Sequence, residues 1–169
     1  MTTTSSTTGP ASAAKAATAG KTSSKTKKAS TKQSAATEER QDLRERTREF
    51  AQNTRGFLRR TPRTIVSMGD CRQLLRASGS IGASYIDASD APGREIFLRC
   101  MSDCRRHARL TTHWLELMGG DLEERSEQSR QDLLTEAHEL ERIFGAIVGK
   151  VLTKMRAERE AAHAEVSAS

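Results

Sequence analysis

The chain has 169 residues, 28 of them basic and 22 acidic, so its formal net charge is +6 at neutral pH. Aromatic residues make up 4% of it and proline occurs three times, which argues against a β-sandwich or barrel, because strands favour aromatic and β-branched residues. No run of 18 apolar residues is present, so no transmembrane helix is expected. Three cysteines, an odd number, predict no disulfide framework and a reducing, cytoplasmic location.

The N-terminal segment, residues 1–37, carries all of the excess charge. It holds six lysines and no acidic residue, and its other residues are mostly Ser, Thr, Ala and Gly. Such a segment buries too little apolar surface to offset chain entropy, so we expect it to be disordered. One interpretation is an electrostatic arm whose lysines, Lys25, Lys27 and Lys28 among them, contact nucleic-acid phosphates. The other is a solubilising tail or linker.

Apolar residues at helical spacing predict helices over residues 38–60, from Pro62 or Arg63 to residue 89, over residues 92–120, and after Ser126, which is the expected cap of the last one. The first expected helix carries Leu43, Phe50 and Phe57 at intervals of seven residues. Short connections favour antiparallel neighbours. The expected fold is therefore all-α: an antiparallel up-down four-helix bundle over residues 38–159, with a disordered C-terminal segment over residues 160–169.

Small residues fill the second expected helix between Gln73 and Ala88, where Gly79 and Gly82 stand among alanines and serines. Each glycine costs an isolated helix about 1 kcal/mol relative to alanine. Close approach of a neighbouring helix would offset that cost, and a loop is the alternative. The apolar line of this helix is expected to comprise Cys71, Leu74, Leu75, Ser78, Ile81 and Tyr85.

Two apolar lines run along the third expected helix. The first comprises Phe97, Cys100, Met101, Cys104, Ala108, Thr111 and Leu115, and is enough for one bundle core. The second comprises Ile96, His107, Leu110 and Trp114. We interpret this second line as a subunit interface anchored by Trp114, because large aromatic residues dominate buried contacts. The alternative is one broad core surface that includes both lines.

Arginines gather on the remaining side of the same helix, at Arg99, Arg105, Arg106 and Arg109. A guanidinium offers planar, fork-like donors that suit phosphate, so this group is the predicted nucleic-acid site of the folded region. Arg72 and Arg76 of the second helix are lesser candidates. The alternative is a solvated face that pairs with the glutamates of the fourth helix.

Charge is unequal between the two halves of the folded region. Residues 38–109 hold 15 arginines against 10 acidic residues, whereas residues 110–169 hold 7 basic against 12 acidic residues. The simplest interpretation is that the two halves neutralise each other. The other is that a basic face is offered to a partner.

The sequence specifies no catalytic site. Cys100, Cys104 and His107 share one helix face and, with Cys71, have the composition of a Cys3His zinc site, but they lack the usual Cys-x-x-Cys spacing. Buried free cysteines behave as small apolar residues. No nucleophile with a partnered base and no phosphate-binding glycine loop is present. We therefore predict a non-enzymatic protein with no catalytic residue, metal or cofactor.

Four blocks in order resemble the four-helix-bundle proteins related to the ribosomal RNA intervening-sequence proteins. They are Gln73–Arg76 with Ser80–Ala83, Tyr85 and Ala88; Thr61–Thr64; Trp114–Leu117; and Glu136–Leu140. The resemblance covers about residues 42–155. The segment Arg94–Cys100 is similar to a related branch, the accessory variability determinant of diversity-generating retroelements.

The resemblance implies a homopentameric ring of bundles that binds nucleic acid. The retroelement branch implies a scaffold that holds a protein partner such as a reverse transcriptase. Together with the basic residues, it predicts a non-enzymatic oligomer that binds RNA or DNA through an arginine face and a lysine-rich tail. The alternative is an accessory subunit whose main partner is another protein.

Overall fold

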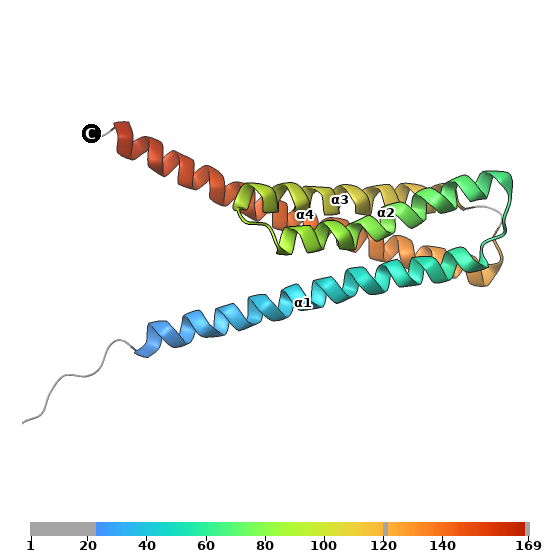
Figure 1. The fold of residues 1–169 in the computed structure, drawn as a ribbon, viewed down its shortest axis with the longest axis horizontal. Coiled ribbons are helices and arrows are strands. Elements are labelled where there is room, and N and C mark those ends of the chain that lie inside the picture. The colour runs from blue at the N-terminus through green and yellow to red at the C-terminus, as the bar shows by residue number, and fades with distance from the viewer. Residues whose placement is uncertain (1–22, 120–121, 168–169) are drawn as a thin grey trace, which may run out of the picture. The chain divides into compact units, whose positions relative to one another are not determined.

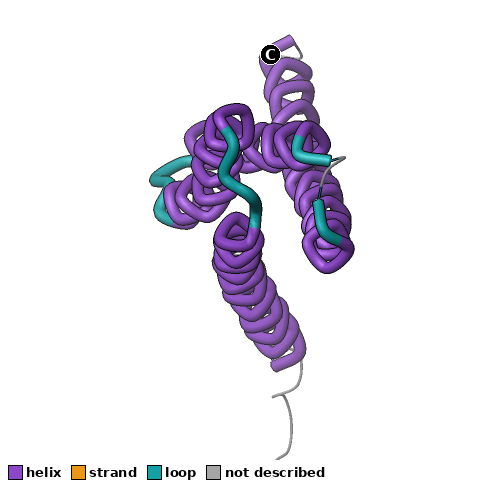
Figure 2. Tube along the Cα trace, turned by 90° about the vertical axis from the view of Figure 1, so that its right-hand side faces the viewer, coloured by secondary structure: helices purple, strands orange, loops and turns teal. Residues whose placement is uncertain are grey.

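The computed structural model describes the backbone of residues 23–119 and 122–167, and side chains from Asp42 onward except at Val66. Its regular elements are helices α1 (Ser23–Arg60), α2 (Ile65–Ser89), α3 (Arg94–Leu117) and α4 (Glu124–Ser167). No strand occurs among the described residues, and the helices are joined by short loops (Figures 1 and 2). The all-helical prediction is confirmed. Within the same residues, none of the helices combines the length and apolar character that crossing a bilayer requires.

The ends of the helical region differ from the expectation. The chain divides into two compact units, residues 1–38 and 39–169, and α1 already begins at Ser23 in the first. The disorder predicted for residues 1–37 cannot be compared over residues 1–22, which lie outside those described. Residues 23–37 are helical, contrary to that prediction. At the other end, α4 continues to Ser167 through residues expected to be disordered. Ala, Lys, Glu, Arg and Gln are strong helix formers, so both helices extend without an apolar line.

Helices of the second unit run antiparallel to their neighbours, as the alternating colour gradients in Figure 1 show. At one end of α3, Arg94 pairs with Glu158 late in α4, and at its other end the Leu115 carbonyl accepts a bond from Arg130 early in α4. Other contacts fit the same order: α1 meets α4 through Arg46 with Glu136 and Arg60 with Ser129, and α2 meets α3 where the Cys104 thiol donates to the Ile81 carbonyl at 3.6 Å.

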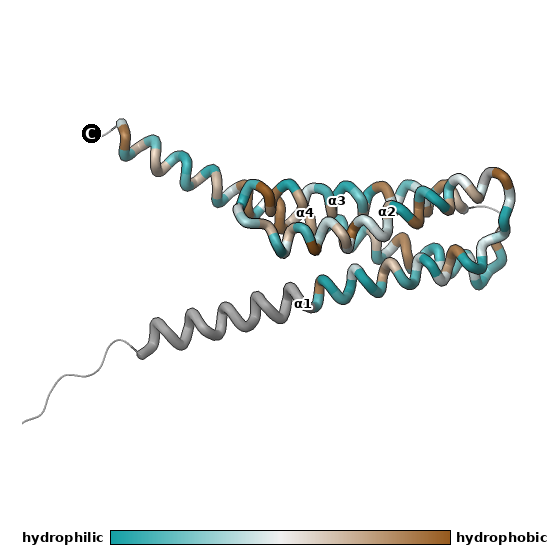
Figure 3. The backbone as a smooth tube through the Cα atoms, in the orientation of Figure 1, coloured by the Kyte–Doolittle hydropathy of each residue, from teal (hydrophilic) through white to brown (hydrophobic). Residues whose placement is uncertain are grey.

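The core sits along the apolar lines that the periodicity predicts. Leu43, Phe50 and Phe57 of α1 are all buried. On α2 the line is buried with two exceptions: Leu75 is 41% exposed and Cys71 is half-buried. Figure 3 shows the hydrophilic positions that separate the apolar ones along α2, α3 and α4. Each helix therefore contributes one face to the core and leaves the rest to solvent.

Local hydrogen bonds set the start of α2. The Thr64 side chain accepts from the Ser67 amide at 3.1 Å, and the Ser67 hydroxyl accepts from the Thr64 amide at 2.8 Å. This reciprocal cap places the helix start at Ile65, after the expected start at Pro62 or Arg63. α4 also begins earlier than expected, at Glu124, and this puts Ser126 inside the helix, where it is buried.

Gly79 and Gly82 lie within α2, so the loop alternative for this segment is wrong. Both face α1. A Cβ added at Gly82 would lie 3.6 Å from the Thr47 hydroxyl oxygen, and one at Gly79 would lie 3.7 Å from a guanidinium nitrogen of Arg55. These are ordinary van der Waals distances, so α1 comes no closer than an alanine would allow. Close packing inside the chain does not account for the two glycines.

Candidate nucleic-acid interface

The α3 arginine cluster comprises Arg99, Arg105, Arg106 and Arg109, all exposed. The opposite side of α3 is fixed in the core by Met101, Cys104, Ala108, Thr111 and Leu115, and that burial directs the arginines outward. Two of them reach toward α4, where one carboxylate, Glu141, faces both. The N–O distances are 3.7 Å from Arg105 and 3.6 Å from Arg109.

Ion pairing of the cluster is incomplete. Distances of 3.6–3.7 Å to Glu141 exceed hydrogen-bond length, and Arg106 approaches Asp103 of its own helix at 3.3 Å. Arg99 forms no ion pair with any side chain that the structure describes. The pairing with glutamates of the fourth helix that the sequence offered as an alternative is thus present but restricted to one carboxylate. The cluster thus has four guanidinium groups and two neighbouring carboxylates, which leaves it a net positive charge.

A groove of about 510 Å³ runs between α3 and α4 beside the cluster. It is lined by Ser102, Arg105, Arg106, Arg109, Leu110, His113 and Val148. On the α4 side, a Cβ added at Gly145 would meet the Arg105 Nε at 3.4 Å, so Gly145 makes room for that guanidinium. At Gly149, one turn further, no atom lies within 4 Å of such a Cβ. The cationic edge is therefore open enough to admit a phosphate group.

Arg72 and Arg76 are exposed on α2 but do not join the α3 arginine cluster. They precede Gly79 at helical spacing and share its face, and Gly79 contacts α1. The predicted lysines Lys25, Lys27 and Lys28 belong to a part of α1 whose side chains lie outside those described. The sequence-predicted cationic residues are thus distributed over separate surfaces.

The second apolar line of α3 is only partly buried. Ile96 is 40% exposed and Leu110 is 38% exposed, whereas Trp114 packs against the core and stacks edge-on against His113 with ring centroids 5.1 Å apart. His107 is half-buried, and its pKa is lowered mainly by burial and to a smaller extent by the nearby charge of Arg106. Its Nδ1 atom has no hydrogen-bond partner within the described structure. The line therefore combines core packing with exposed apolar surface.

The cysteine-histidine constellation does not form a site. Burial raises the pKa of the Cys104 thiol to about 12, and burial together with the Asp70 charge raises that of Cys71. Over the described ranges, no group of three or more His, Cys, Asp or Glu side chains is arranged to hold a metal ion. Cys104 is fully buried, and Cys71 and Cys100 pack against the core from its edge, so all three contribute to packing.

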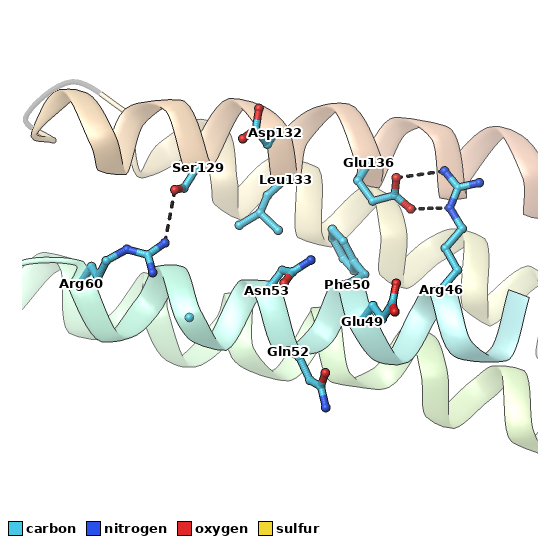
Figure 4. A pocket seen from close by; sticks show the side chains of 11 residues that line it. Arg46, Glu49, Phe50, Gln52, Asn53, Arg60, Ser129, Asp132, Leu133 and Glu136 are labelled. Carbon is cyan, nitrogen blue, oxygen red and sulfur yellow. Dashed lines mark hydrogen bonds and ion pairs between the residues drawn. The ribbon is translucent and has the colours of Figure 1, made fainter. Parts of the chain in front are cut away.

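A second groove lies between α1 and α4 (Figure 4). Arg46 forms a bidentate ion pair with Glu136, in which Nε donates to Oε1 at 2.6 Å and Nη2 donates to Oε2 at 2.9 Å. These hydrogen bonds raise the pKa of Arg46. Toward the other end of the groove, Arg60 donates to the Ser129 hydroxyl at 3.2 Å. Since the Arg46 guanidinium is engaged by α4, this groove joins the two helices and presents less free charge than the α3 edge.

Sequence reasoning missed Arg130. Its side chain is buried at 8% exposure, donates from Nη1 to the Leu115 carbonyl at 2.9 Å, and binds Glu127 from Nε at 2.7 Å. It closes the C-terminal end of α3 and belongs to the fold rather than to the interface. Arg130 precedes Leu133 and Ala137 at helical spacing, so the periodicity places it on the apolar line of α4. Because arginine is charged, it was not counted among the core positions.

In comparisons with family models, curated proteins and solved structures, nothing matches this chain. The resemblance to the intervening-sequence proteins and to the retroelement accessory branch remains a prediction.

Proposed function

We propose that this chain is a non-enzymatic, up-down four-helix-bundle protein that assembles into oligomers and binds nucleic acid, RNA or DNA. The observation that carries the proposal is the incomplete neutralisation of the α3 arginine cluster, where three of the four exposed guanidinium groups share two carboxylates at 3.3–3.7 Å and Arg99 has none among the described side chains. An exposed ion pair of this kind contributes about 0–1 kcal/mol, so a phosphate oxygen can replace the carboxylate at little cost.

Binding would be electrostatic and independent of base sequence. Phosphates that dock on the cluster would release condensed counterions, and each neutralised phosphate would steepen the salt dependence of binding. The Arg105 guanidinium covers Gly145, and the open space at Gly149, one turn further along α4, leaves the donors accessible from that side. We propose that Lys25, Lys27 and Lys28 add further phosphate contacts.

Assembly would use the partly exposed apolar line of α3. Ile96 and Leu110 keep 40% and 38% of their surface in solvent, and a subunit contact would remove it from water. We propose that a ring of five subunits forms in this way, through an interface that Trp114 anchors and that includes His107. The same exposed apolar surface favours a second candidate function, an accessory subunit that holds a protein partner such as a reverse transcriptase. The free cysteines Cys71, Cys100 and Cys104 support a cytoplasmic location.

The test is fluorescence anisotropy of a labelled duplex and a labelled single strand with the full-length protein across a salt series. A double variant, Arg99→Gln with Arg106→Gln, should weaken binding and flatten the salt slope by about 2. The matched control, Arg125→Gln with Arg142→Gln, removes two exposed charges from α4 and should leave the slope unchanged. Equal slopes for both pairs would contradict the role of the α3 cluster. For assembly, Leu110→Glu should lower the mass measured by light scattering.

A further inference from the structure

A row of arginines on α1 has no counterpart in the sequence-predicted site. Arg44, Arg55 and Arg59 are exposed, and the spacing of 11 and 4 residues keeps them on one helix face. Arg48 shares that face but binds Glu45, from Nε to Oε2 at 2.9 Å. None of the other three guanidinium groups forms an ion pair with a carboxylate that the structure describes.

The face turns toward α2 at Arg55, and Arg72 and Arg76 lie on the face of α2 that carries Gly79. The Arg55 guanidinium lies over Gly79, with Nη2 3.7 Å from the position of an added Cβ, while Nη1 donates to its own helix at the Ala51 carbonyl. Because α1 and α2 are antiparallel, Arg59 lies toward the half of α2 that carries Arg72 and Arg76. Both of these are exposed, and neither forms an ion pair within the described structure. We name these five residues the α1/α2 arginine face: Arg44, Arg55, Arg59, Arg72 and Arg76.

Its electrostatics differ from those of the α3 arginine cluster. In the α3 cluster, Glu141 faces two of the arginines and Asp103 faces a third. On the α1/α2 arginine face, the five guanidinium groups meet no carboxylate among the described side chains. Bringing a phosphate here therefore displaces no carboxylate, and only Arg55 already uses one nitrogen, to the Ala51 carbonyl of its own helix.

The shape of the face identifies the kind of anion. At about 1.5 Å per residue, Arg44 and Arg59 stand about 22 Å apart along α1, so a small anion can meet only one or two of the groups. A nucleic-acid duplex presents one phosphate charge about every 1.7 Å along its axis, and a straight polyanion can face the whole row. Met68, Leu75 and Ile86, at 41–45% exposure on the same side of α2, offer apolar contact to sugars.

We propose that the α1/α2 arginine face binds the phosphate backbone of a nucleic acid and contributes more to affinity than the α3 arginine cluster. The inference rests on the proposed nucleic-acid function and assigns it a different principal surface. It also gives Gly79 a role, because a bulky side chain there would occupy the space in which the Arg55 guanidinium lies.

The experiment uses full-length protein, a fluorescein-labelled duplex and a salt series. The variant is Arg55→Gln with Arg59→Gln and Arg72→Gln. It should lower the affinity about tenfold or more at low salt and flatten the slope of log K against log salt by about 2.7, at about 0.9 for each phosphate contact. Glutamine is polar and these positions are exposed, so the fold is expected to persist, which circular dichroism checks.

A control with the same net charge is Arg125→Gln with Arg142→Gln and Arg156→Gln, all exposed on α4. A slope that falls as far in this control as in the α1/α2 variant would overturn the inference, since net charge alone would then explain binding.

Two further outcomes separate the inference from the proposed function. If the Arg99→Gln, Arg106→Gln variant loses more affinity than the α1/α2 variant, the inference fails and the proposed function stands. If wild-type protein binds neither duplex nor single strand, both fail. Binding to phosphatidylserine vesicles without binding to nucleic acid would assign the face to a membrane surface and also overturn the inference.

Discussion

Replacing Arg130 with alanine should destabilise the bundle more than any other arginine substitution considered above. The side chain is buried, and its Nη1 atom supplies the hydrogen bond that the Leu115 carbonyl receives near the end of α3. Leu115 itself has no exposed surface, so in the folded bundle its carbonyl depends on this donor. The guanidinium also lies close to Gly119, whose added Cβ would stand 3.3 Å from Cζ.

The magnitude follows from these contacts. A buried carbonyl left without its donor costs about 1–3 kcal/mol, and loss of the packed aliphatic stem adds on the order of 1 kcal/mol. The ion pair with the half-buried Glu127 contributes little, because that carboxylate regains water when its partner is removed. The expected decrease in the free energy of unfolding is therefore about 2–4 kcal/mol. The free energy of unfolding of Arg130→Lys should lie between those of wild type and Arg130→Ala, because lysine keeps the positive charge and loses the planar set of guanidinium donors.

Urea unfolding followed by circular dichroism, at one protein concentration, measures the effect. Arg125→Ala is the matched control, since Arg125 is exposed in the first turns of the same helix, and it should change the free energy of unfolding by less than about 0.5 kcal/mol. If Arg130→Ala were equally mild, the Arg130–Leu115 bond would not be what holds the end of α3.

Three other predictions concern single residues. Hydrogen bonds from Arg130 and then Gln131 lower the pKa of Glu127 from 4.5 to about 2, so the unfolded chain binds this proton more readily. The resulting stabilisation, which solvent screening keeps small at this partly exposed carboxylate, is complete above about pH 4.5 and lost as the pH falls toward 2. Urea titrations between these pH values should show that Glu127→Gln removes that part of the pH dependence. Gly149→Ala should raise the free energy of unfolding by about 0.5–1 kcal/mol in thermal melts, because nothing lies within 4 Å of the added Cβ; Gly145→Ala, whose Cβ meets an arginine nitrogen at 3.4 Å, should gain less. Glu141→Gln should strengthen nucleic-acid binding in anisotropy, because it frees the two arginines that the carboxylate faces; unchanged or weaker binding would count against the α3 arginine cluster.

Core positions were predictable because helical periodicity is a local property. Leu43, Phe50 and Phe57 recur every seven residues, and all three are buried. The prediction that Leu75 is buried was wrong, because Leu75 lies at the edge of the apolar line of α2. Burial at that edge depends on where α1 packs, and Leu75 stays 41% exposed. The start of α2 failed for a local reason, since the Thr64–Ser67 cap outweighs the suitability of Pro62 for a first turn.

The sequence by itself determined that the chain is helical, which residues line the core of each helix, and that arginine is concentrated before residue 110. These properties depend on neighbours within a few residues. Only the tertiary structure decided which arginines are neutralised: Arg105 and Arg109 face Glu141, Arg46 grips Glu136, and the α1/α2 arginine face has no carboxylate partner among the described residues. Ion pairing depends on the register between helices far apart in sequence. That register is set by core packing, and no single helix encodes it.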